Sequence, residues 1–178
     1  AQAFRDQATT AFKEKRFDDA VTLYAATLNH MNNVGYEMPD KLRAEILEMT
    51  IPCSNNLALC YMKTENFDNA EVYANNGVML IDAMEGQIKK GFSNTWGEML
   101  KRGLTFEKMT KDWKKKSYFL KGKALLKKNK FDDAIKCFNT AIALVKGEEK
   151  YLKAVKELED LISQAKTGIK KEKKKDQK

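Results

Sequence analysis

Apolar side chains recur at helical spacing at the start of the chain, in two stripes separated by a short polar turn. The turn is the sequence Glu-Lys-Arg at positions 14–16. Apolar residues three and four positions apart line one face of an α-helix. The stripes therefore predict two short antiparallel helices that pack against each other. Their members are Phe4, Ala8, Ala11 and Phe12, followed by Phe17, Ala20, Val21, Tyr24 and Leu28.

The same pattern returns twice, each time around a Phe-Asp-Asp/Asn-Ala sequence. The related stretches are FKEKRFDDA at 12–20, YMKTENFDNA at 61–70 and LLKKNKFDDA at 125–134. Small residues also recur, and small side chains let two helix backbones approach closely. The pattern predicts an all-α fold built from three helix pairs, at about 1–33, 51–84 and 115–148. The equivalent small positions are Ala8, Ala58 and Gly122, and then Ala20, Ala70 and Ala134.

The three predicted repeats are unevenly spaced, which indicates two insertions. Phe17 and Phe67 are 50 residues apart, whereas Phe67 and Phe131 are 64 apart. The first insertion, about 34–50, predicts a loop followed by an extension of the next helix, because Leu42, Ile46 and Leu47 form a helical stripe. A last apolar stripe predicts a capping helix at about 150–166. Residues 1–165 are therefore expected to form one domain.

The second insertion, about 85–114, is rich in aromatic residues and leaves two interpretations open. Its aromatic side chains either pack an added helical segment against the second and third repeats or form a surface that binds a partner. These residues are Phe92, Trp96, Phe106 and Trp113.

The charge of the chain is concentrated at its end. The net charge is +8, and residues 166–178 hold seven lysines and two acidic residues, a net +5. This lysine-rich tail predicts a solvated helix end that frays into disorder, or else a weak contact with a polyanion, calmodulin or acidic lipid. A nucleic-acid binder would show a basic folded face with interleaved aromatic residues, so specific nucleic-acid binding is disfavoured.

Composition narrows the class of protein further. No apolar run reaches 18 residues, so no membrane-spanning segment is expected, and no signal-peptide pattern is present. Cys53, Cys60 and Cys137 are odd in number and lack metal-site spacing, which indicates reduced thiols and a cytoplasmic protein. His30 is the only histidine. No cofactor, metal site or catalytic constellation is predicted, so the chain is not expected to be an enzyme.

These repeats resemble the tetratricopeptide repeat, a 34-residue helical pair that stacks into a right-handed superhelix. Gln7 and Lys121 depart from the family pattern at places where leucine is usual. The lengthened helix before the second repeat and the long final helix resemble the three-repeat domains of large immunophilin co-chaperones, the cyclophilin and FK506-binding types. That resemblance also leaves open the possibility that the chain is a piece of a prolyl isomerase whose catalytic domain lies outside it.

In those co-chaperones a carboxylate clamp grips the C-terminal Glu-Glu-Val-Asp of heat-shock protein 90 or 70. The resemblance places Arg5 on the first lysine of the clamp and Thr9, with one hydroxyl to donate, on the first asparagine. Asn56 and Lys116 match the second asparagine and the next lysine. Fixed cations and amides bind a terminal carboxylate through charge-assisted hydrogen bonds.

The clamp is incomplete at its last position. Leu120 stands where the family has arginine, and Lys121 lies beside it, turned about 100° around the helix. The resemblance implies that the groove binds the heat-shock protein tail through a partly degenerate clamp. Binding of another peptide in the groove, or assembly through the aromatic insertion, remains open.

Overall fold

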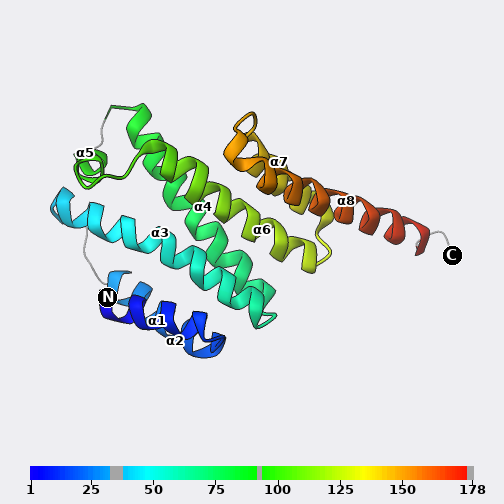
Figure 1. Cartoon of the computed structure of the whole chain (residues 1–178), viewed down its shortest axis with the longest axis horizontal. Coiled ribbons are helices and arrows are strands. Elements are labelled where there is room, and N and C mark those ends of the chain that lie inside the picture. Colours follow the sequence, from blue (N-terminus) through cyan, green and yellow to red (C-terminus); the bar gives the residue numbers. More distant parts are fainter. Residues whose placement is uncertain (33–37, 92–93, 176–178) are drawn as a thin grey trace.

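The computed structural model describes residues 1–32, 38–91 and 94–175, and every element in this part of the chain is a helix. The first pair is α1 (Gln2–Lys13) and α2 (Phe17–Asn32), the second is α3 (Asp40–Lys63) and α4 (Phe67–Lys89), and the third is α6 (Lys115–Lys127) and α7 (Phe131–Ala143). Each helix packs on the next along the stack, and α8 (Leu152–Lys175) packs on α7 (Figure 1). The predicted all-α fold of stacked helix pairs is confirmed.

The turn within each pair has the same backbone conformation. Lys15, Glu65 and Asn129 have φ angles of 63°, 57° and 59°, and each lies two residues before the phenylalanine that begins the second helix. This left-handed conformation disfavours most L-residues by about 1–2 kcal/mol, so the surrounding contacts must hold it. One of these contacts is a backbone hydrogen bond that closes the end of the first helix. It runs, at 2.9 Å in every pair, from Arg16 to Ala11, from Asn66 to Tyr61 and from Lys130 to Leu125.

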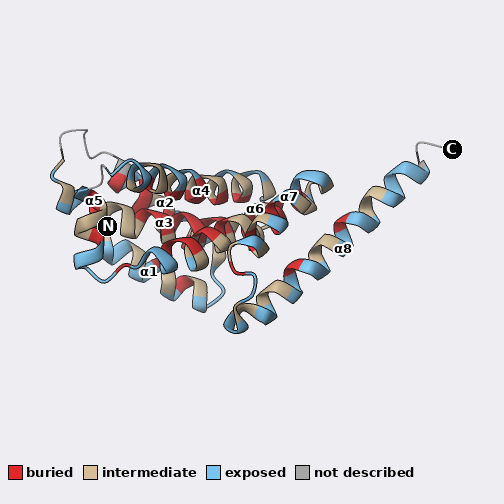
Figure 2. Cartoon of the chain, turned by 90° about the horizontal axis from the view of Figure 1, so that it is seen from above, coloured by how far each residue is buried: buried red, intermediate tan, exposed pale blue. Residues whose placement is uncertain are grey.

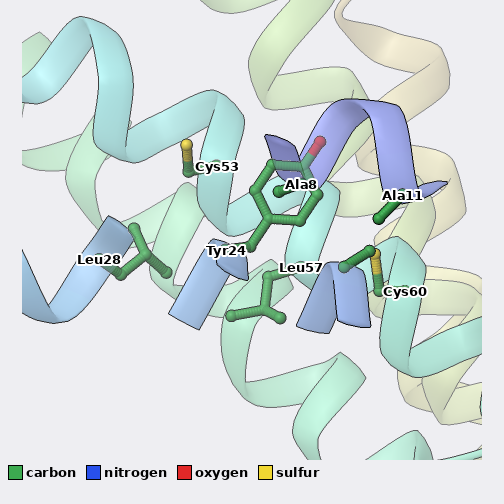
Figure 3. Close-up of a cluster of buried hydrophobic side chains, with 8 residues drawn as sticks. Ala8, Ala11, Tyr24, Leu28, Cys53, Leu57 and Cys60 are labelled. Atoms are coloured by element: carbon green, nitrogen blue, oxygen red, sulfur yellow. The ribbon is translucent and has the colours of Figure 1, made fainter. Parts of the chain in front are cut away.

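Close approach of the two helices in each pair is set by the size of two facing residues. A Cβ atom on Gly122 would lie 2.5 Å from the ring of Phe138, so the third pair has no room for a methyl group there. The equivalent facing positions are Ala8 with Tyr24 and Ala58 with Ala74, and all of these side chains are buried. The first of these pairs lies in the cluster shown in Figure 3.

The two insertions pack against each other rather than separately. The first lengthens α3 at its start, and the second contains the end of α4, α5 (Asn94–Lys101) and a π-helix (Lys108–Lys114) that runs directly into α6. Thr95 donates a hydrogen bond to Asp40 at 2.7 Å. Together they surround a second hydrophobic core, made of Ala44, Ile51, Ile81, Met84, Met99, Leu104 and Met109.

The final helix is longer than the sequence pattern predicted. α8 continues past the expected end at residue 166 to Lys175, so the prediction of a frayed end from 166 onward is wrong over this stretch. Buried Ala165 continues the apolar stripe, and Gly168 packs so closely that a Cβ there would lie 2.4 Å from the ring of Phe131. Lysine is also a good helix former. Figure 2 shows the end of α8 projecting beyond the stack.

None of the helices described by the structure is long and apolar enough to cross a membrane.

Replacing Gly122 with alanine should destabilise the protein. Overpacking against Phe138 costs about 1–3 kcal/mol, which exceeds the roughly 1 kcal/mol that alanine gains over glycine in a helix. Gly86 in α4 is the matched control, because a Cβ there meets nothing within 4 Å. Thermal unfolding followed by circular dichroism should show a lower Tm for Gly122→Ala and an unchanged or higher Tm for Gly86→Ala. Equal shifts in the same direction would contradict the packing argument.

Candidate functional site

Hydrogen bonds connect the first helix of all three pairs through four side chains. Lys116 Nζ on α6 donates to Asn56 Oδ1 on α3 at 2.8 Å. Asn56 Nδ2 donates to Tyr24 Oη on α2 at 3.2 Å. Tyr24 Oη lies 3.1 Å from Thr9 Oγ1 on α1, and Thr9 donates in turn to the carbonyl of Arg5 at 2.9 Å.

The hydrogen bonds have one consistent direction. The Thr9 proton is used by the Arg5 carbonyl, so the Tyr24 hydroxyl donates to Thr9 and accepts from Asn56. Burial raises the pKa of Tyr24, which keeps this hydroxyl protonated. We call the surface shared by Arg5, Thr9, Asn56 and Lys116 the clamp face. The hydrogen bonds hold the Asn56 amide in one orientation and position the Lys116 ammonium beside it.

Lys116 is the strongest candidate for binding an anion. Burial lowers the pKa of its ammonium, and no carboxylate in the described part of the chain forms an ion pair with it. A cation that is partly removed from water and unpaired is stabilised by an incoming negative charge. The clamp face therefore offers one desolvated cation beside a fixed amide.

Arg5 supplies a second cation at the other end of the hydrogen-bonded series. Its side chain is 37% exposed, and its ion pair is with Asp6 at 3.4 Å, the next residue on α1. An exposed pair of this kind contributes little. Arg5 is thus available to a ligand on the clamp face.

Three of the predicted contacts are used within the protein. The Thr9 proton is directed at the carbonyl of Arg5, so a peptide would compete with that carbonyl for it. Leu120 is 2% exposed and packs with Ala58 and Ala74, so it cannot contact a peptide. Lys121 Nζ donates to Asn75 Oδ1 on α4 at 2.7 Å, away from Lys116. The structure therefore brings together Arg5, Asn56 and Lys116 and excludes Leu120.

Tyr24 is the residue of this site that the sequence pattern did not single out. It belongs to the apolar stripe of α2 and takes the same place as Ala74 and Phe138 in the other repeats, so it was assigned to the core. Its ring is indeed buried among Ala8 and Leu57 (Figure 3). The signal available in the sequence was that only this repeat places a hydroxyl at that position.

The aromatic residues of the second insertion divide into two groups. Trp96 and Trp113 are half-buried against the second core. Phe106 is 47% exposed and meets Trp96 edge to face, with ring centroids 6.2 Å apart. Phe92 lies outside the described residues. Of the predicted partner surface, Phe106 is therefore the member that presents a large exposed apolar area.

The three cysteines are free and buried. Within the described ranges, no group of three or more His, Cys, Asp and Glu side chains could hold a metal ion. Burial raises the pKa of Cys53 to about 11 and that of Cys60 to about 12. Since the thiolate is the nucleophile, both thiols are unreactive near neutral pH.

Comparison with known proteins agrees with the helical architecture. Residues 116–148, which span α6 and α7, match the family model of the tetratricopeptide repeat. No curated protein matches the chain. The match and the three stacked helix pairs support a tetratricopeptide-repeat domain, a class of protein-interaction module.

Replacing Tyr24 with phenylalanine should break the series of hydrogen bonds. The change leaves the Asn56 amide without its acceptor and Thr9 without its donor, so the free energy of unfolding should fall by about 1–2 kcal/mol. Tyr73→Phe is the control, because the Tyr73 hydroxyl makes no hydrogen bond within the described residues. Urea denaturation of both variants tests this, and equal stability of the two would contradict the assigned network.

Proposed function

We propose that this domain is a co-chaperone-type interaction module that binds the acidic C-terminal peptide of heat-shock protein 90 or 70 on its clamp face. The observation that carries the proposal is the unpaired, partly buried Lys116 ammonium, held by Asn56 on the same face as Arg5. The terminal carboxylate would take charge-assisted hydrogen bonds from Lys116 and Arg5. The resemblance to immunophilin co-chaperones supplies the identity of the peptide.

The Asn56 amide limits the strength of this clamp. One of its two Nδ2 protons goes to Tyr24 and its Oδ1 accepts from Lys116, so one N–H remains for a peptide. Loss of the arginine contact at Leu120 removes a further charged hydrogen bond, worth about 1.5–3 kcal/mol, or roughly ten- to a hundredfold in affinity. We therefore expect binding weaker than that of a complete clamp.

The proposal includes no catalytic step. We infer that the domain works by binding alone, in the cytoplasm, as expected from its reduced cysteines. Any prolyl isomerase activity would belong to a separate domain, so this chain should show none.

A titration with a short peptide ending in Glu-Glu-Val-Asp tests the proposal. Binding should be measurable by calorimetry and should disappear when the peptide C-terminus is amidated, because the terminal carboxylate is then lost. Lys116→Met keeps the aliphatic stem and removes the charge, and it should weaken binding about tenfold or more. Lys146→Met, at an exposed position, makes the same chemical change away from the clamp face and should have no effect. Equal binding of the amidated and free peptides would disprove the proposal.

A second candidate function rests on the exposed apolar side chains of the second insertion. Leu100 is 49% exposed and Phe106 is 47% exposed, both on this segment. A scaffold partner that uses this surface should lose binding to Phe106→Ser and be unaffected by Lys116→Met. A pull-down of the same partner with both variants distinguishes the two functions, since the clamp predicts the opposite result.

A further inference from the structure

A cavity of about 340 Å³ lies where the second insertion meets α1 and α3. We call it the insertion pocket. It is lined by Arg5 of α1, by residues of α3 and by residues of the second insertion, so both insertions and the first repeat contribute to it. The lining residues that matter are Arg5, Glu48, Pro52, Arg102, Lys108 and Trp113.

The insertion pocket is continuous with the clamp face. Glu48, Pro52 and Asn56 are spaced four residues apart on α3 and so lie along one face of that helix. Arg5 belongs both to the pocket and to the clamp face. A peptide held at Asn56 and Lys116 would therefore have this pocket beside it.

Two cations in the insertion pocket are available to a ligand. Arg102 is already held at 2.9 Å by both Glu45 and Glu48. In contrast, neither Arg5 nor Lys108 forms an ion pair with a carboxylate of another helix within the described residues. Arg5 pairs with the exposed Asp6 of its own helix at 3.4 Å, a contact that contributes little, so both side chains leave positive charge open to a ligand.

Glu48 lines the same pocket, and its main-chain carbonyl lacks the usual helical donor. Its Oε1 atom is buried and has no hydrogen-bond partner among the described residues, while its Oε2 atom accepts from Arg102. Pro52 has no N–H, so the Glu48 carbonyl lacks the regular helical donor one turn ahead. Oε1 is enclosed within the protein, whereas the Glu48 carbonyl is left to take a donor from a ligand or water.

These charges and acceptors together select a ligand. A free anion would meet Arg5 and Lys108 but would leave the Glu48 carbonyl without a donor. An extended acidic residue carries both a carboxylate and a main-chain N–H, and it satisfies both sets of groups. Trp113 offers an apolar wall for the methylene stem of such a residue.

We propose that the insertion pocket binds an acidic side chain upstream of the C-terminal residue of the peptide on the clamp face. Its carboxylate contacts Arg5 and Lys108, and its main-chain N–H donates to the Glu48 carbonyl. This inference rests on the proposed function, and it adds a specificity site that the second insertion supplies.

A double-mutant cycle between protein and peptide tests this inference. The protein variants are Lys108→Ala and, as a control of equal charge change on the same insertion, Lys101→Ala. Among the residues that the structure describes, Lys101 pairs only with Glu98 of its own helix, and it does not line the pocket. The parent peptide ends in Glu-Glu-Val-Asp, and in each variant peptide one upstream glutamate is replaced with glutamine. The amidated parent peptide is measured alongside.

The expected result is coupling at one upstream glutamate. Its replacement should weaken binding to the wild-type and Lys101→Ala proteins about three- to tenfold. The same replacement should have little further effect on Lys108→Ala. In a Trp96→Phe background, the emission of Trp113 should also change on binding of the free peptide, because this ring lines the pocket.

Other outcomes separate the two proposals. In one, amidation abolishes binding while the changes in binding free energy caused by Lys108→Ala and by every glutamate replacement are additive. In that case the insertion pocket is not a binding site, but the proposed function is retained. If neither the free nor the amidated peptide binds, the proposed function fails, and this inference fails with it.

Discussion

The close approach of the two helices in each pair is the constraint on which the rest of the structure depends. Gly122 leaves room for the Phe138 ring, and Ala8 faces the buried ring of Tyr24 in the same way. This distance is repeated because each turn closes with the same 2.9 Å backbone hydrogen bond. Once the first pair is this close, the Tyr24 hydroxyl at the edge of the core comes within reach of both Thr9 and Asn56.

The hydrogen bond between Asn56 and Tyr24 explains why the clamp face is well ordered but is expected to bind a peptide less strongly. Tyr24 fixes Asn56, and Asn56 in turn fixes Lys116, so the ammonium is held in place before any ligand arrives. Preorganisation of this kind reduces the entropy lost on binding. However, an amide that uses one of its two N–H groups inside the protein has only the other to offer a carboxylate. The stability of the face and its capacity for hydrogen bonds to a peptide are therefore in opposition.

Sequence periodicity was enough to predict the repeats, because the apolar stripes and the small residues record contacts within one helix pair. It was not enough for contacts between distant segments. Arg102 reaches Glu45 and Glu48 across more than fifty positions in the chain, and nothing in the local pattern marks that pairing. The end of α8 was missed for a similar reason, since the contact of Gly168 with Phe131 depends on α7. The family pattern suggested Leu120 as part of the site, but it packs with Ala58 and Ala74.

The burial of Leu120 has a consequence for where positive charge can enter the groove. An arginine at this place would bury its guanidinium among alanines, which is costly without a paired carboxylate. The π-helix extends α6 toward its start and carries Lys108 to the opposite end of the same groove, next to Arg5. π-helical segments are often found at functional sites. The second insertion therefore adds Lys108 beside Arg5 of α1, next to the Glu48 carbonyl that Pro52 in the middle of α3 leaves without a helical donor. On the proposals above, such a groove binds an upstream acidic residue in addition to the terminal carboxylate.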